Sequence, residues 1–297
     1  MSASRSIDII ELLVTFPERQ FTLSDIVKAT GINIASAHAI VNVLLQRGYL
    51  VRAAKDRTYQ LGPSLIASGF SALRGYPIVS RAMWTARKLR DELDLSVSLS
   101  TIVDDEILML LSAEGGNPQE MGVRAGERLP LVAPFGAPFL AWSTDKEVEK
   151  WLARRDKPLS EKKRKEIFDN LRLTRDRGYQ VTLRAKQTKS IGTLMAEMAG
   201  SAGILDYRHE VNRLVQVLDT DVHQPSDFEP NEYYDLLLIA APIFNKDGEA
   251  IYSLALTGFS SQLSGNTVLQ YAEKLSRSCL DLMRQDRVVS RNLRKVG

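Results

Sequence analysis

The sequence predicts an α+β chain in two parts, a small helical N-terminal domain closed by a β-hairpin and a larger C-terminal domain built on antiparallel strands. Residues 22–61 combine two short segments of helical periodicity with two alternating strands. Residues 95–113 and 236–258 each have the pattern of a hairpin, and apolar helical segments flank them. A chain of 297 residues, 44% of them hydrophobic, is long enough for two such domains.

Helical periodicity begins at residues 4–15, and the side chains expected to face the core there are Ile7, Ile10, Leu13 and Val14. Thr22 and Asp25 predict the start of a second helix, because each side chain can bond the other's backbone amide in a capping box. Gly31 predicts the end of this helix, since the sharp turn that follows requires a residue that tolerates positive φ.

Asn33 is expected to cap a third helix that has an apolar face and an uncharged polar face. The apolar face consists of Ala37, Ile40, Val41 and Leu44. The opposite face consists of Ala35, His38, Ala39, Asn42 and Gln46. Asn and Gln side chains suit the edge of adenine, so this face is a candidate for reading base pairs.

A hairpin follows the third helix, with strands at 49–51 and 58–61 and a polar tip at 54–57. Lys55 and Arg57 in the tip can bind phosphate. The order helix, turn, helix and hairpin is typical of a winged helix-turn-helix, which lays one helix in the major groove of double-stranded DNA. A small helical subdomain without a nucleic-acid role has the same pattern, and this alternative stays open.

Segments 4–13, 22–32, 47–50 (RGYL) and 59–62 (YQLG) together resemble the N-terminal domain of the IclR family of bacterial transcriptional regulators. The resemblance continues to the C-terminus, apart from one insertion. It implies a winged helix-turn-helix at 1–62, a linker helix at 63–76 and a GAF-like α+β effector-binding domain at 77–297, with a helical insertion at about 183–234. It also implies a homodimer or a dimer of dimers that binds an operator and a small-molecule effector.

The residues expected to contact DNA or to hold the reading helix are Arg5, Thr22, Asn33, Ser36, His38, Asn42, Gln46, Lys55 and Arg57. One departure from the family pattern concerns the third helix. The family usually has Ser-Thr and then an Arg there, whereas this chain has Ala35, Ser36 and Ala39. Loss of the Arg removes a contact worth ~1–3 kcal/mol, so a DNA-silent sensor or co-regulator is a second hypothesis.

Helical segments surround the predicted strands of the larger domain. Residues 63–73 read as the linker helix, with an apolar stripe that offers a surface for a second copy. A longer helix starts at Pro77, and Trp84 is expected in its core-facing stripe. Three strands are then expected, at 95–103, 107–113 and 120–123.

Residues 126–141 read as a buried loop that enters a short helix, and a loop that only packs is the alternative from the residues alone. The resemblance implies that this loop and the later strands line the effector pocket. The residues so assigned are Met121, Leu129, Phe135, Gly136, Ala137, Thr182, Leu236, Leu238, Ala255 and Thr257. They are mostly apolar, which favours a small organic acid or an aromatic acid over a sugar phosphate.

Several classes of function are disfavoured. The chain has no nucleophile with matching base, no glycine-rich phosphate loop and a single cysteine, Cys279, so an enzyme is the weakest hypothesis and an internal disulfide is excluded. Asp206, His209, Glu210 and His223 lack the spacing of a zinc helix, and we expect neither metal nor cofactor. With no run of 18 apolar residues and no signal-like start, a cytoplasmic protein without membrane contact is expected.

Overall fold

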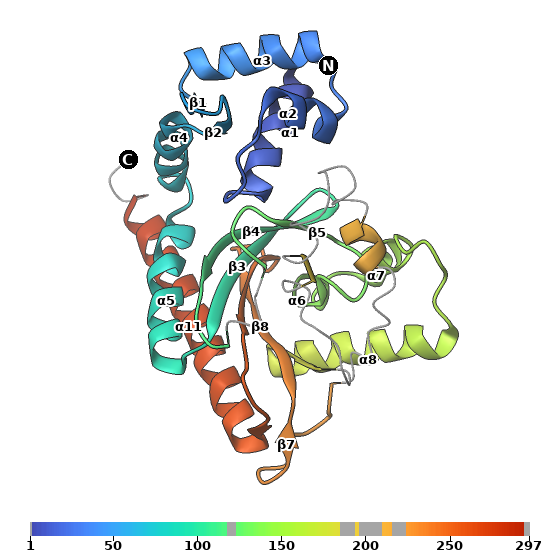
Figure 1. Ribbon diagram of the computed structural model, residues 1–297. Coiled ribbons are helices and arrows are strands. Elements are labelled where there is room, and N and C mark those ends of the chain that lie inside the picture. The colour runs from blue at the N-terminus through green and yellow to red at the C-terminus, as the bar shows by residue number, and fades with distance from the viewer. Residues whose placement is uncertain (1, 118–122, 185–193, 196–209, 216–223, 294–297) are drawn as a thin grey trace. The chain divides into compact units, whose positions relative to one another are not determined.

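The computed structural model describes residues 2–117, 123–184, 194–195, 210–215 and 224–293 (Figure 1). Its contacts divide the chain into one unit that contains residues 1–77 and another that contains residues 78–184 and 224–293. Both contain helices and antiparallel strands, and the predicted α+β class is confirmed. Within the described residues, no single helix combines the length and apolarity needed to cross a membrane; α2 and α3 meet that test only as a pair, which is bent by 117°.

The first unit has the predicted order of elements. These are α1 (Ser2–Thr15), α2 (Leu23–Thr30), α3 (Ile34–Gln46), β1 (Leu50–Arg52), β2 (Tyr59–Leu61) and α4 (Pro63–Leu73). The capping box is present, since the Thr22 amide donates to Asp25 Oδ2 at 2.9 Å and the Asp25 amide donates to Thr22 Oγ1 at 3.2 Å. Gly31 ends α2 at φ 67°, and Asn33 Oδ1 accepts from the Ser36 amide at 2.9 Å.

The core-facing side of α1 differs from the prediction. Ile9, Leu12, Leu13 and Phe16 are buried, whereas Ile7 is 52% exposed. The physical reason lies just beyond the helix, where the Phe16 ring packs against Phe21 with 6.1 Å between the centroids. This contact turns the stripe that ends in Phe16 inward, so Ile7 falls outside it.

The second unit is built on a six-stranded antiparallel sheet of order β5-β4-β3-β9-β8-β6. Its strands are β3 (Ser96–Val103), β4 (Glu106–Ala113), β5 (Arg128–Pro130), β6 (Gln180–Leu183), β8 (Leu236–Phe244) and β9 (Ala250–Thr257), and a separate ribbon pairs β7 (Tyr233–Tyr234) with β10 (Leu263–Ser264). Its helices are α5 (Pro77–Leu93), α6 (Ala137–Leu140), α7 (Asp145–Leu152), α8 (Glu161–Arg177) and α11 (Gly265–Leu293). Of the strand predicted at 120–123, only Val123 is described and it is not in a strand; the edge strand is β5.

One face of the sheet forms the core with α11. Its side chains are apolar and at most 1% exposed, and the central ones are Val97, Leu99, Ile239, Ala241, Leu254 and Leu256. The register places Val97, Leu256 and Ile239 in one row across three strands. Helix α5 runs beside α11 on this side of the sheet (Figure 1). This face is therefore closed, and only the opposite face is free to build a site.

Cys279 lies in this core, 2% exposed, with its thiol 3.8 Å from the Ala241 carbonyl oxygen. Burial raises the pKa of the Cys279 thiol far above its ordinary range. Because only the thiolate reacts quickly, we expect no labelling of the native protein by Ellman's reagent at pH 8 and one equivalent in guanidinium chloride. Rapid labelling without denaturant would contradict the packing of α11 on the sheet.

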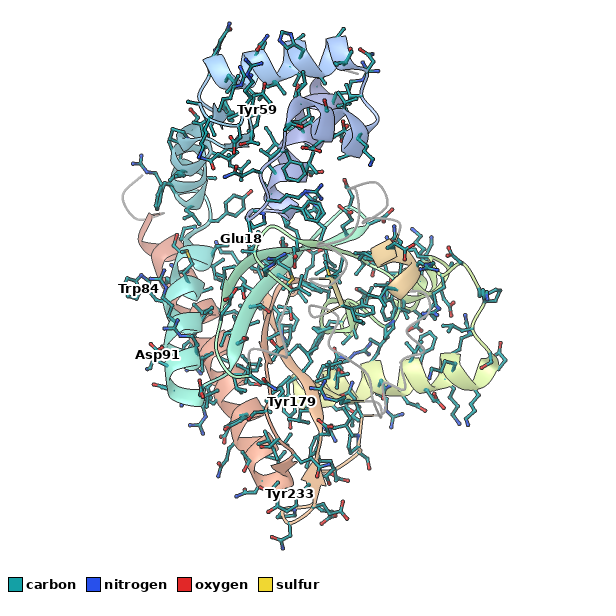
Figure 2. All side chains as sticks on the ribbon, viewed as in Figure 1. Glu18, Tyr59, Trp84, Asp91, Tyr179 and Tyr233 are labelled. Atoms are coloured by element: carbon teal, nitrogen blue, oxygen red, sulfur yellow. The ribbon has the colours of Figure 1, made fainter. Side chains whose placement is uncertain are left out.

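Trp84 corrects another expectation. The buried stripe of α5 consists of Ile78, Val79, Ala82, Ala86 and Leu89, whereas Trp84 is 74% exposed. Its ring projects away from the helix (Figure 2), with the Arg87 guanidinium 5.9 Å from the ring centroid. At 100° per residue, position 84 falls opposite the stripe, and the small residues at 82 and 86 are those that fit the close helix packing.

Candidate functional site

Helix α3 presents its uncharged polar side outward. Ala37, Ile40, Val41 and Leu44 are buried as predicted, which fixes the orientation of the helix in the first unit. The opposite side carries Ala35, His38, Ala39 and Gln46, all exposed, and the half-exposed Asn42. The Asn42 amide nitrogen lies 3.3 Å from His38 Nδ1, so these two side chains lie together one helical turn apart.

The wing and the helix caps place the remaining candidate DNA residues. Lys55 and Arg57 are exposed between β1 and β2, where Arg57 adopts a left-handed conformation at φ 58°. Arg5 is half-exposed on α1. The Thr22 side chain is committed to its capping box, where its hydrogen bonds hold the pKa of Asp25 below its ordinary value. Thr22 therefore fixes the start of α2, and its contact with DNA stays a prediction.

The second face of the sheet lies under α6 and the loop before it. Ile102 of β3 lines a hollow of about 400 Å³ together with Leu131, Phe139 and Leu140. Trp142, just after α6, packs edge-on against Phe244 of β8 with the ring centroids 4.9 Å apart. The loop is buried at Leu131, as expected, and its Phe135 carbonyl accepts a hydrogen bond from Trp151 Nε1 at 3.0 Å.

A row of four paired residues crosses the middle of this face. Ser98 of β3 pairs with Ala255 of β9, Ala255 with Ala240 of β8, and Ala240 with Gln180 of β6. Three strand spacings of ~4.8 Å separate the ends of the row by about 14 Å. The two alanine side chains are short and form the middle of the row, which we call the alanine floor. A hydrogen-bonding side chain lies at either end of it.

The two ends of the alanine floor are polar, whereas the sequence predicted a mostly apolar pocket. Ser98, Ser100 and Ser253 are 4–8% exposed, and none of their hydroxyl groups has a hydrogen-bond partner in the described chain. Gln180 is 4% exposed; its Nε2 donates to Thr182 Oγ1 at 3.1 Å, and its buried Oε1 has no partner among the described residues. Serine at alternate positions in 96–100 was the sequence signal for this lining.

The structure brings together only some of the predicted effector residues. Thr182, Leu238, Ala255 and Thr257 gather on the face of the alanine floor. Leu129 of β5 lies in one row with Ile102 of β3, because both pair with the same residue of β4. Ile102 lies six residues along β3 from Ser96, the residue that pairs with Thr257. At ~3.3 Å per residue this separates Leu129 from Thr257 by about 20 Å along the strands.

The other predicted effector residues fall into three groups. Phe135, Gly136 and Ala137 lie in the loop and first turn of α6, and Gly136 has φ 94°. Leu236 does not share the face of Leu238, because a register shift in the pairing of β6 with β8 turns it to the other side, where it is fully buried. Met121 lies outside the described residues, as does most of the predicted insertion at 183–234.

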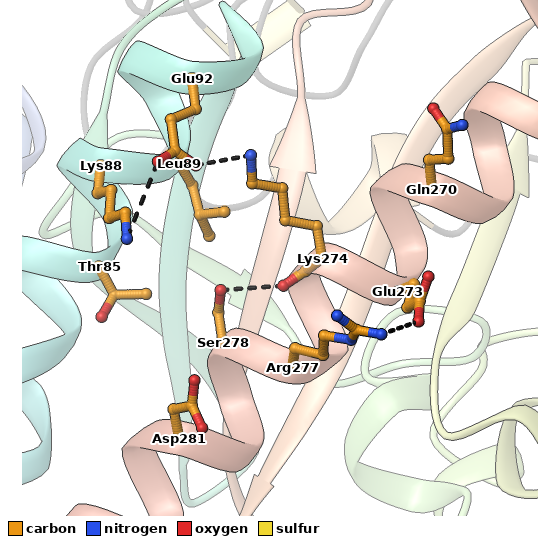
Figure 3. Close-up of a pocket in the computed structure, with 10 residues that line it drawn as sticks. All are labelled: Thr85, Lys88, Leu89, Glu92, Gln270, Glu273, Lys274, Arg277, Ser278 and Asp281. Carbon is orange, nitrogen blue, oxygen red and sulfur yellow. Dashed lines mark hydrogen bonds and ion pairs between the residues drawn. The ribbon is translucent and has the colours of Figure 1, made fainter.

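A hollow of about 430 Å³ lies between α5 and α11 and is lined by charged side chains (Figure 3). Lys274 Nζ lies 2.6 Å from Glu92 Oε2, and Lys88 Nζ lies 3.9 Å from Glu92 Oε1. The hydrogen bond from Lys274 holds the pKa of Glu92 below its ordinary value. The opposite charges in these ion pairs neutralise one another, so the hollow lies at a contact between two helices that ion pairs hold together.

No group of His, Cys, Asp or Glu side chains is arranged to hold a metal ion in the part of the chain that the structure describes. Asp105 pairs with Arg154 at 2.6 Å and Glu106 with Arg128 at 2.9 Å, so both carboxylates are already engaged. Asp206, His209 and His223 lie outside the described residues, and the expectation for them stays a prediction.

Both halves of this architecture match known protein families. Residues 2–54 match the IclR helix-turn-helix domain, and residues 70–192 match the C-terminal domain of the bacterial transcriptional regulator IclR. The chain belongs to the IclR family of transcriptional regulators. The family resemblance in the sequence is thereby confirmed, with the prediction of a DNA-binding regulator rather than an enzyme.

Relatives of this IclR-family regulator align over nearly its whole length. The HTH-type transcriptional regulator XynR of Escherichia coli K12 is 22% identical over 286 residues, which cover 95% of this chain and 96% of XynR. The IclR regulator structure from Alicyclobacillus acidocaldarius has a TM-score of 0.69 at 19% identity and covers 95% of this chain and 97% of its own. An IclR homologue of Microbacterium hydrocarbonoxydans, solved with 4-hydroxybenzoate, has a TM-score of 0.65 at 17% identity, with 97% and 100% covered.

Proposed function

We propose that this IclR-family regulator binds a symmetric operator as a cytoplasmic homodimer and that a small hydroxylated acid on the alanine floor changes its affinity for DNA. The observation that carries the DNA part is the outward polar side of α3 together with the exposed cations Lys55 and Arg57 of the same unit. A mobility-shift assay at low salt with the DNA upstream of its own gene tests it. The absence of any retardation would favour the DNA-silent sensor, the second hypothesis.

The dimer is supported by α4, in which no residue is buried within a single chain. Ile66 and Phe70, one turn apart, are 64% and 68% exposed. Isolated exposed apolar side chains are common, but an entire helix without buried residues leaves its apolar stripe for a second copy. Trp84 on the second unit, 74% exposed, is a further apolar side chain that a contact with another copy would bury.

The effector is inferred from the hydrogen-bonding groups at the two ends of the floor. The hydroxyl groups of Ser98, Ser100 and Ser253 can donate to a carboxylate, while Gln180 Oε1 needs a donor. A hydroxyl group on the far end of the effector supplies that donor. The 4-hydroxybenzoate bound by the Microbacterium homologue carries both groups, and we use this compound as a probe.

Gln180→Leu tests this arrangement, because leucine keeps the bulk and removes the acceptor. Native mass spectrometry with 4-hydroxybenzoate and benzoate is expected to show that the wild type prefers the hydroxylated acid and that the variant loses about tenfold of this preference. DNA affinity without acid is expected to stay unchanged. Gln270→Leu, at an exposed position of α11, is the matched control. An unaltered preference in Gln180→Leu would refute the assignment.

A further inference from the structure

Helix α3, which we propose reads the base pairs, contains no acidic residue, lysine or arginine. From Ala29 to Gln46 the chain contains no Asp, Glu, Lys or Arg, so every side chain that α3 can extend is neutral apart from the titratable His38. The commonest specific contact in the major groove is an Arg or Lys to the O6 and N7 of guanine. Helix α3 has no cation with which to make it.

The outward side of α3 presents methyl groups in place of cations. At 100° per residue, Ala35, Ala39, Asn42 and Gln46 share the direction opposite the buried stripe. Val43, at the flank of this side, is 56% exposed, and Ile34 at the N-terminal end is 62% exposed. Alanine lets the helix backbone approach the base pairs closely, and its methyl group can contact the C5-methyl group of thymine.

Asn42 and Gln46 add hydrogen bonding of matching specificity, since carboxamides pair with N6 and N7 of adenine. The Asn42 amide nitrogen lies 3.3 Å from His38 Nδ1 and 3.4 Å from His38 Nε2, so one N–H of the amide contacts the imidazole ring. The second N–H and Oδ1 remain for adenine N7 and N6–H. His38 is thus a positioning residue that holds the amide plane of Asn42.

We infer that this regulator reads A·T base pairs, through thymine methyl groups at the N-terminal half of α3 and adenine edges at its C-terminal half, and makes no guanine contact from this helix. The inference rests on the proposed placement of α3 in the major groove. Phosphate binding is left to cations outside the outward side of α3, which are Lys55 and Arg57 in the wing and the exposed Lys28, Arg47 and Arg52.

The experiment selects bound duplexes from a randomised library with the full-length protein and then replaces thymine by deoxyuridine in the selected site, which removes only the C5-methyl group. We expect half-sites with A·T cores, and an affinity about fourfold lower for each contacted thymine replaced, so about sixteenfold lower for a symmetric pair. Replacement of thymines outside the selected core is the matched control and is expected to change nothing.

A variant tests the same idea from the protein side. Ala39→Arg restores a cation to the reading face and is expected to shift the selected core to include guanine at a fixed position, with loss of the response to uracil there. Selected G·C cores in the wild type, or A·T cores that tolerate uracil, would overturn the inference while leaving the proposed function standing. No enrichment of any sequence would overturn both.

Discussion

Asn42→Ala is expected to weaken binding to the selected operator by about 1–3 kcal/mol for each half-site, so by about 2–6 kcal/mol for a symmetric dimer, while binding to random DNA changes little. The reason is that the Asn42 amide, half-exposed and oriented by His38, has two groups left for a base edge. Fluorescence anisotropy with operator and scrambled duplexes at one salt concentration measures both losses.

Arg57→Ala is the matched comparison, because Arg57 is exposed in the wing, where we expect it to bind the phosphate backbone. This variant is expected to weaken operator and scrambled DNA alike and to reduce the slope of log affinity against log salt by about 1 for each protomer. If Asn42→Ala weakened both duplexes equally, the base-reading role of Asn42 would be refuted. If Arg57→Ala weakened binding to the operator alone, the assignment of base contacts to α3 and of phosphate contacts to the wing would be wrong.

The first unit was predictable from sequence because its structure is decided locally. Thr22 and Asp25 bond one another three residues apart, Gly31 adopts the positive φ that the turn needs, and Asn33 caps α3 through the Ser36 amide. Such signals depend on residue types at fixed spacings. Ile7 was misplaced because the inward direction of α1 is set by Phe21, which follows the helix by several residues and packs on Phe16.

The effector face was predicted less well because sheet register is not a local property. The pairing of Ser98 with Ala255 joins strands separated by more than half of the chain, and Leu236 changes face through a register shift that no alternation in its own strand announces. The family resemblance predicted four residues of this face, which are Thr182, Leu238, Ala255 and Thr257. It did not predict Gln180 or the serines, whose hydrogen-bonding groups are left without partners among the described residues, which only a structure reveals.

Phe70→Lys is expected to have the largest effect on operator binding without touching DNA. Phe70 is 68% exposed on α4, and a lysine charge placed in a self-complementary apolar contact would face its own copy across the two-fold axis. Separated protomers bind single half-sites and lose the effective concentration that joins them, a loss of about 10²- to 10⁴-fold in operator affinity. Analytical ultracentrifugation reports the dissociation, and anisotropy reports the loss of affinity.

Ser68→Lys is the control that separates the apolar contact from the added charge, because Ser68 lies on the opposite side of the same exposed helix. It adds the same charge to α4 and is expected to leave both the dimer and its operator affinity intact. If Phe70→Lys stayed dimeric, the second copy would have to be held elsewhere, with Trp84 the next surface to test. If the Phe70→Lys variant became monomeric yet bound the operator with unchanged affinity, each α3 would bind DNA on its own. The proposal of a symmetric operator bound by a dimer would then be wrong.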